Sequence, residues 1–152
     1  MSFPRGRHPQ AVLHRAVFLI GYVVRHKWYL LLERRRFNVP WLAVLTHDLD
    51  KFRPDYLWLW IMHDQVEQAN RLHESRAPHK WEWWSDAREP SGYRPMPDEV
   101  RREMLADWLA SQRMRGGRGY VQRVVATYHA HREAVGLHPC TRAWVEEQLR
   151  AF

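Results

Sequence analysis

The chain has 152 residues, of which 45% are hydrophobic and nine are tryptophan, and its formal charge is +7. This length and composition predict one folded domain over residues 1–152, and they exclude a pair of independent domains and a disordered chain. The longest apolar run, residues 16–24, is about half as long as a membrane span, and the single Cys140 excludes an internal disulfide framework. We therefore expect a cytoplasmic protein without a signal peptide or a membrane segment.

The excess positive charge comes mostly from arginine, which is scattered along the chain and clustered at residues 34–36. This balance favours an anionic partner, either a small phosphorylated compound, a nucleotide or a nucleic acid. A solvated, arginine-rich surface explains the same charge equally well. The sequence has no nucleic-acid-binding motif of defined spacing.

The first predicted helix covers residues 9–34. Its apolar positions recur every three or four residues, at Leu13, Val17, Ile20, Val24, Trp28 and Leu31. A second row, which is mostly apolar, contains Leu19, Tyr22, His26 and Tyr29. Two apolar rows predict that this helix is buried on more than one side and that His26 faces the interior. Residues 1–8 are expected to form a flexible N-terminus.

The next two predicted helices cover residues 40–47 and 54–76. Pro40 lies in the first turn of the earlier one, and His47-Asp48 falls near its C-terminal end. Ala77-Pro78 ends the later one. On one continuous helix, His73 and His79 would lie about 120° apart. The break at Pro78 allows both imidazoles to point to one place.

The C-terminal half contains a predicted loop at residues 87–96, followed by helices over residues 97–115, 120–134 and 141–152. In the first of these helices, Asp107 lies on an otherwise apolar stripe, where a carboxylate is costly unless it is paired. Thr141 is the predicted cap of the last helix. No strand-like alternation of useful length occurs. The sequence thus predicts an all-α domain of about six helices.

Six of the side chains follow the order H…HD…H…H…D and predict a metal centre. Adjacent His47 and Asp48 can bind one ion together with a distant His and a distant Asp, and two further His can hold a second ion with Asp48 bridging. Imidazole and carboxylate suit divalent iron, manganese, cobalt or zinc. The six predicted ligands are His26, His47, Asp48, His73, His79 and Asp107.

Ten His residues also produce such an order by chance, and a single helical His is more often a surface or core residue than a ligand. Three features favour the metal centre. His26, His73 and Asp107 lie on apolar stripes, long helices can aim side chains at one point, and the two aspartates have few basic neighbours on their own helices. His63-Asp64 is the alternative His-Asp pair, and Glu103 is either an outer acceptor for an imidazole or a surface acid.

The run His47-Asp-Leu-Asp-Lys51, within this order of His and Asp, resembles the HD-domain superfamily of metal-dependent enzymes. A more specific resemblance, over residues 22–150, is to a small family of bacterial and phage proteins of unknown function. It rests on Arg25-His-Lys27, His47-Asp-Leu-Asp-Lys-Phe52, Leu72-His73, His79-Lys-Trp-Glu-Trp-Trp84, Met96-Pro97, Glu103-Met104, Ala106-Asp-Trp108, His138-Pro139 and Thr141-Arg142.

The superfamily implies a helical fold around one or two metals. By position, His26, His47, Asp48 and Asp107 correspond to its core set, and His73 and His79 to the extra imidazoles of its two-metal branches. Two departures are Asp50, where many members have a small residue, and the short spacing between His73 and His79.

The reaction that the superfamily implies is metal-dependent hydrolysis of a small phosphorylated substrate or a nucleotide. Asp48 would take part in catalysis, and Lys51 and Arg53 would hold the phosphate oxygens. The first alternative is a di-iron oxygenase that uses dioxygen on a small anionic substrate, like the HD proteins that resemble myo-inositol oxygenase. Trp81, Trp83 and Trp84 would then line a dry pocket, or they pack a loop onto the core. The second alternative is a basic nucleic-acid-binding protein with a structural metal.

Overall fold

The computed structural model describes residues 8–152, so the predicted flexible segment 1–8 lies, apart from His8, outside the described residues. The described part of the chain contains seven α-helices and no β-strand, which confirms the all-α class. An isolated antiparallel bridge joins Ser85 to Tyr93 in the loop before α5.

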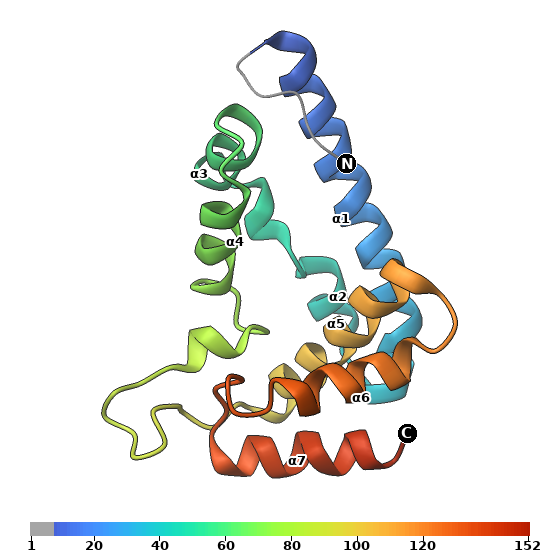
Figure 1. The fold of residues 1–152 in the computed structure, drawn as a ribbon, viewed down its shortest axis with the longest axis vertical. Helices are drawn as coiled ribbons and strands as arrows, with labels where there is room; N and C mark the ends of the chain where they lie inside the picture. The colour runs from blue at the N-terminus through green and yellow to red at the C-terminus, as the bar shows by residue number, and fades with distance from the viewer. Residues whose placement is uncertain (1–7) are drawn as a thin grey trace.

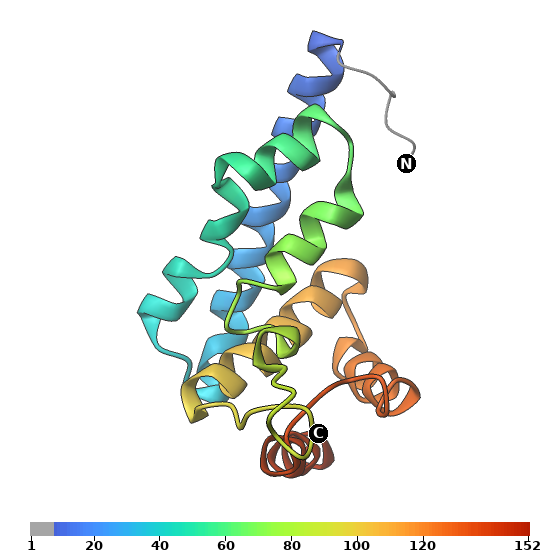
Figure 2. The ribbon, with the colours of Figure 1, turned by 90° about the vertical axis from the view of Figure 1, so that its left-hand side faces the viewer.

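The long helices α1 (Pro9–Phe37) and α5 (Asp98–Gly116) pack against each other at the centre of the fold. α6 (Tyr120–Ala130) and α7 (Pro139–Arg150) lie against α5 at the lower end of the molecule in Figure 1. Between α1 and α5 the chain climbs along α1 and then returns, as Figure 2 shows. The elements of this excursion are α2 (Trp41–Thr46), η1 (Leu49–Phe52), α3 (Pro54–Leu57), η2 (Trp58–Met62), α4 (Val66–Glu74) and η3 (Trp81–Trp84).

The main core forms where α5 packs between α1, α6 and α7. Leu30 of α1, Leu105 and Leu109 of α5, and Val145 of α7 are fully buried there. A smaller apolar cluster around Leu19 joins the upper part of α1 to the α3–α4 excursion. The excursion is thereby held against α1, and it brings α2 and α4 beside the α1–α5 pair.

The prediction that α1 is buried on more than one side is wrong. The row that contains Leu19 and His26 faces the core, and Leu19 and His26 are at most 2% exposed. The other apolar row lies on the surface, where Val17 and Val24 are each 62% exposed. Its periodicity predicted the helix correctly, because both rows repeat at helical spacing, but periodicity does not say which row has a partner.

The prediction of one continuous helix over residues 54–76 is also wrong. The helix passes into a single π-helical segment, η2, and ends there, and α4 begins at Val66. Asp64 adopts φ 56°, in the left-handed region that Asp tolerates better than most residues. The buried Arg15 of α1 stabilises this break, because its Nε donates to the carbonyl of Ile61 at 2.7 Å.

Two other helix ends differ from the predictions. α6 ends at Ala130 rather than near residue 134, and the chain continues in a hydrogen-bonded turn. α7 begins at Pro139, and its cap is His138, whose side chain accepts from the backbone N–H of Cys140. Thr141 is not the cap. It is fully buried, and its Oγ1 accepts from the backbone N–H of Met96, which ties the loop before α5 to α7.

None of the helices in the described part of the chain is both long enough and apolar enough to cross a membrane.

Candidate metal centre

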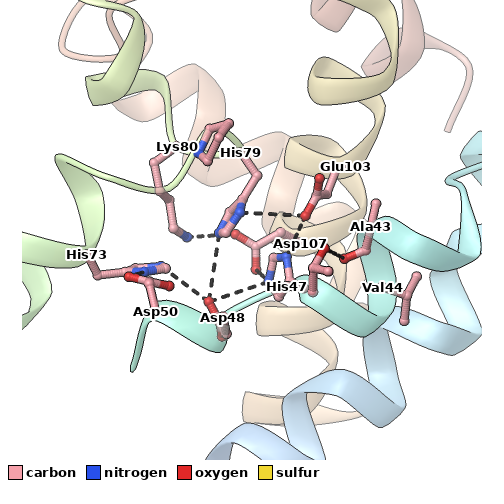
Figure 3. Close-up of polar contacts among 12 residues, drawn as sticks. Ala43, Val44, His47, Asp48, Asp50, His73, His79, Lys80, Glu103 and Asp107 are labelled. Atoms are coloured by element: carbon pink, nitrogen blue, oxygen red, sulfur yellow. Dashed lines mark hydrogen bonds and ion pairs between the residues drawn. The ribbon is translucent and has the colours of Figure 1, made fainter. Parts of the chain in front are cut away.

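All six predicted ligands meet in one buried cluster, and none of them is more than 4% exposed. α1 and α5 contribute one side chain each from their middle turns, and the other four come from the excursion between these helices. Figure 3 labels five of the six, His47, Asp48, His73, His79 and Asp107. We call this set the His/Asp cluster. Its members are His26, His47, Asp48, His73, His79 and Asp107.

The first half of the cluster joins α1, α5 and the end of α2. His26 Nε2 lies 2.9 Å from Asp107 Oδ1 and 3.1 Å from His47 Nε2. His47 Nε2 lies 3.6 Å from the same Asp107 oxygen. These three atoms can serve as ligands of one metal ion.

The second half joins Asp48 to the end of α4. Asp48 Oδ1 lies 3.2 Å from His73 Nε2 and 3.8 Å from His79 Nε2. It is also 3.7 Å from His47 Nε2, so a single carboxylate oxygen lies next to both halves. These atoms of Asp48, His73 and His79 can hold an ion as well.

The donor atoms of this second half are buried without a hydrogen-bond partner. Asp48 Oδ1, His73 Nε2 and His79 Nε2 each have less than 1 Å² of accessible surface and no hydrogen-bonding partner in the structure. Buried polar atoms are rarely left in this state, because the loss of hydration is then uncompensated. Lone pairs converging on a common point are the arrangement that a divalent cation requires, so the residues present fit a metal ion.

The backbone at His47-Asp48 explains how neighbouring residues aim at one point. The sequence predicted His47-Asp48 near the C-terminal end of a helix, and in the structure α2 ends at Thr46 with His47 as its C-cap. Asp48 follows with φ 61°. On a continuous helix, adjacent side chains diverge by about 100°. The left-handed turn at Asp48 brings its carboxylate back beside the His47 ring. Such strained backbone is typical of functional sites.

Outer carboxylates fix three of the four imidazoles. Glu103 Oε1 lies 2.8 Å from His47 Nδ1 and 3.5 Å from His79 Nδ1, and Asp50 Oδ2 lies 2.8 Å from His73 Nδ1. When Nδ1–H donates to a carboxylate, the lone pair of the ring resides on Nε2, which is the nitrogen that faces the centre of the cluster. This carboxylate–histidine pairing is the usual support of a metal ligand. Glu103 is thus an acceptor for an imidazole, and together with His47 and His79 its carboxylate also forms a group of donors that could hold an ion.

Two lysines balance the two inner carboxylates. Lys51 Nζ donates to Asp48 Oδ2 at 2.9 Å, and Lys80 Nζ donates to Asp107 Oδ2 at 2.7 Å. In both aspartates the other oxygen, Oδ1, faces the imidazoles. The ammonium groups therefore hold each carboxylate with one oxygen directed to the centre of the cluster.

The electrostatics of the cluster favour a positive charge at its centre. Burial disfavours the imidazolium form of His47, but Asp48, Asp107 and Glu103 outweigh burial and raise its pKa to about 9. Burial, with the charges of His47 and Lys80, holds the pKa of His79 well below its usual value. With neutral imidazoles, the carboxylates of Asp48, Asp50, Glu103 and Asp107 exceed Lys51 and Lys80 by two charges.

The predicted phosphate-binding residues lie in different surroundings. Lys51 is 7% exposed, and it lies over the ring of Tyr22 as well as against Asp48. Arg53 is largely exposed, and its Nε lies 3.9 Å from a carboxylate oxygen of Asp55. Arg76 forms a two-bond ion pair with the same Asp55. The phosphate contacts of Lys51 and Arg53 stay predictions.

The alternative pair His63-Asp64 lies outside the cluster, at the break between η2 and α4. The ring of His63 packs against Trp58, with 4.8 Å between the ring centroids, and Asp64 lies 3.9 Å from Arg15. Neither residue belongs to a group of donors that could hold an ion among the described residues. His47-Asp48 is thus the pair that the fold brings together with the other predicted ligands.

A cavity of about 280 Å³ opens beside the cluster, between α5, α6 and the segment at residues 80–81. Asp107 and Lys80 form the part of its wall that is shared with the cluster. The remaining wall is aromatic, aliphatic and polar, and it consists of Trp81, Trp108, Ser111, Gln112, Arg115, Val124, Thr127, Tyr128, His131 and Val135. Of the three tryptophans that the sequence grouped together, only Trp81 lines this cavity; Trp83 is 41% exposed, and the Nε1 of Trp84 donates to the carbonyl of Pro78.

Comparison with known proteins identifies the family of this chain. The model of a family of unknown function, DUF5662, matches residues 53–151. The chain belongs to the DUF5662 family. The matched region contains His73, His79, Glu103 and Asp107, and it begins after His47-Asp48. No curated protein matches the chain, and no solved structure matches it either. The DUF5662 match includes all the residues that line the cavity and half of the His/Asp cluster.

Sequence reasoning did not assign a role to Asp50 or Lys80. Asp50 follows Asp48 by two residues, and its carboxylate supports His73. Lys80 follows His79 directly, and it supports Asp107 from a different segment. An acid or a base within two residues of a predicted ligand is the signal that points to such support, but only the fold shows which ligand receives it.

Proposed function

We propose that this DUF5662 protein is an HD-type phosphohydrolase with two divalent cations, acting on a small phosphorylated substrate or a nucleotide. The observation that carries the proposal is the convergence of four imidazole Nε2 atoms and two aspartate Oδ1 atoms at a buried point. Asp48 Oδ1 lies next to both halves and is the candidate bridge between two ions. Two ions held in this way would activate water and neutralise phosphate charge.

The charge balance supports a phosphorylated substrate. Ligation of a metal requires neutral imidazoles. The carboxylates of Asp48, Asp50, Glu103 and Asp107 then exceed the two lysines by two charges, so a site that holds two divalent ions would carry two positive charges. A phosphate monoester carries about −1.5 to −2 charges at neutral pH. The loaded site would therefore complement a phosphate group, whereas one ion alone would leave it neutral.

The cavity supplies a place for the rest of the substrate. Its aromatic walls, Trp81, Trp108 and Tyr128, suit a planar or apolar group. Lys80, Arg115 and His131 add hydrogen-bond donors for an anion. Because Asp107 belongs both to the cluster and to the cavity wall, a phosphate at that end of the cavity would reach the metal centre.

In the proposed reaction, the oxygen of a water molecule bonds to phosphorus as the bond to the leaving oxygen breaks. The electron pair of that bond stays on the leaving oxygen, which takes up a proton, and inorganic phosphate and an alcohol are the products. Lys51 and Glu103 act as positioning residues, since Lys51 holds the Asp48 carboxylate and Glu103 orients the rings of His47 and His79. The buried, helical surroundings keep the side chains of Lys51 and Glu103 in fixed positions.

A di-iron oxygenase is the second candidate, favoured by the number of imidazoles. Four His and two Asp at one buried point would also suit two irons. The basic groups of the cavity suit an anionic substrate of either enzyme, so they do not separate the two candidates. The two candidates differ in what they consume, since only the oxygenase takes up dioxygen.

The test is release of inorganic phosphate by the full chain after chelator treatment and reloading with manganese or cobalt. The substrate panel contains nucleoside monophosphates, sugar phosphates and p-nitrophenyl phosphate. We expect release from at least one of them, and loss of release in His47→Ala. The matched control is His63→Ala, which changes the other His-Asp pair and should retain activity.

Absence of release from the whole panel, or equal release by His47→Ala and the unchanged protein, would overturn the phosphohydrolase. Oxygen uptake by the iron-loaded protein with a small anionic substrate, without phosphate release, would favour the oxygenase instead. Far-UV circular dichroism of both variants is the control that tests whether the helices remain intact.

A further inference from the structure

The surface formed by α1, α2 and η1 exposes an unusually large number of apolar side chains. Nine large hydrophobic side chains are at least 50% exposed there, and they define what we call the α1–α2 face. They are Leu13, Val17, Ile20, Val24 and Trp28 of α1, Trp41, Leu42 and Leu45 of α2, and Leu49 of η1. Among the described residues, only Trp58 is a large hydrophobic residue of comparable exposure outside this face.

The α1 part of the face has the spacing of a helix–helix interface. Leu13, Val17, Ile20 and Val24 follow one another at intervals of four, three and four residues, which is the heptad spacing of paired helices. Residues 16–24 contain no charged side chain. Gly21 is exposed in the middle of this stretch, and a Cβ added there would meet nothing within 4 Å. A second helix backbone can therefore approach closely at this point.

The α2 part forms a groove against α1. A hollow of about 390 Å³ is lined by Val24, Trp28, Leu31, Trp41, Val44, Leu45 and Leu49, with Lys27 as its single charged residue. The ammonium group of Lys27 is turned to the end of α2, where it donates to the carbonyls of Leu45 at 2.7 Å and Val44 at 3.3 Å. An apolar occupant of the groove would thus leave the Lys27 ammonium with its two carbonyl acceptors.

We propose that a second copy of this chain covers the α1–α2 face and that the protein is a homodimer. At about 100 Å² of accessible surface each, the nine side chains present on the order of 900 Å², and a stable interface takes about 800 Å² from each partner. Monomeric proteins rarely expose an apolar patch of more than a few hundred Å². The face carries both a projecting apolar helix row and an apolar groove, so two copies related by a two-fold axis can each fill the groove of the other.

The interface would lie on the far side of the helices that build the His/Asp cluster. His26 is two residues from Val24, but it faces the interior, and His47 follows Leu45 at the end of α2. The dimer would hold α1 and α2 together without covering the cluster or the cavity. The inference does not rest on the proposed hydrolysis, and either can fail without the other.

The test is the mass of the full chain in solution, measured by sedimentation velocity and by light scattering from micromolar to tens of micromolar concentration. We expect twice the 18.4 kDa mass of one chain. The double variant Ile20→Glu with Val24→Glu should be a monomer with unchanged helical circular dichroism, because both side chains are exposed on the folded chain. The matched control Trp58→Glu changes a 56% exposed side chain on η2 and should remain a dimer.

A monomeric wild-type chain over this range would overturn the proposal, and so would a double variant that stays dimeric. The wild-type chain is also tested on vesicles of zwitterionic and anionic phospholipid. Binding of a monomer to vesicles, abolished by the double variant, would show that a lipid surface covers the face and would likewise overturn the dimer.

Discussion

Removal of the carboxylate charge of Asp48 should abolish the stabilisation that the protein gains from divalent cations. Asp48 is 3% exposed, and its Oδ1 is the oxygen next to His47, His73 and His79. An ion that binds the folded chain and not the unfolded one stabilises the fold by about 2.7 kcal/mol at a free concentration 100 times its Kd. For a chain of this length, this corresponds to a rise in Tm of about 5–11 °C per ion.

The assay is thermal unfolding of chelator-treated protein with and without manganese. Each variant is compared with itself, because Asp48→Asn also leaves the ammonium of Lys51 without its carboxylate and should lower the Tm of the ion-free protein. Asn tolerates the left-handed backbone at position 48, so the turn itself can be retained. The matched control is Asp98→Asn, which changes an exposed carboxylate at the start of α5.

We expect the manganese-dependent rise in the unchanged protein and in Asp98→Asn, and little or none in Asp48→Asn. An equal rise in all three proteins would show that the ion binds elsewhere, and no rise in the unchanged protein would refute the reasoning altogether.

Three further predictions concern the fold. Glu33→Ala should lower the free energy of unfolding by about 2 kcal/mol, measured by urea denaturation. The buried Glu33 carboxylate accepts from Arg113 at 2.6 Å, and its loss would leave the partly buried guanidinium of Arg113 unpaired. An unchanged urea midpoint would contradict this role. Leu105→Ala should cost about 2–5 kcal/mol in the same assay, since the side chain is fully buried in α5, and a cost below 1 kcal/mol would argue against the core described above. Gly136→Ala should cost about 1–3 kcal/mol, because a Cβ there would lie 1.9 Å from Tyr93 Cζ, and the cost should vanish in a Tyr93→Ala background if that ring is the cause.

The helical class and the six clustered side chains could be predicted from the sequence because both depend on local signals. Helical periodicity is a property of neighbouring residues, and it located all the long helices. An acid such as Asp107 or an imidazole such as His26 on an apolar row is conspicuous because burial without a partner is costly. The His-Asp pair at 47–48 is recognisable for its chemistry, although its geometry depends on a left-handed turn rather than on a helix.

The predictions that were wrong or missing concern features that depend on tertiary contacts. Two apolar rows on α1 repeat with the same period, and the structure covers one with α5 and leaves the other exposed. The break at Asp64 depends on Arg15, which is 46 residues from its Ile61 acceptor along the chain. The partner of Asp107 is likewise distant, since Lys80 lies 27 residues before it. Sequence spacing carries no information about such pairs.

Elemental analysis of the full chain after chelator treatment, reloading and removal of free metal counts the cation sites that we propose to meet at Asp48. We predict two ions per chain in the unchanged protein, one in His26→Ala, one in His73→Ala and fewer than one in Asp48→Asn, with His63→Ala as the control that keeps two. A metal content that is near zero in the unchanged protein, or that stays the same in all of these variants, would show that Asp48 does not join two cation sites.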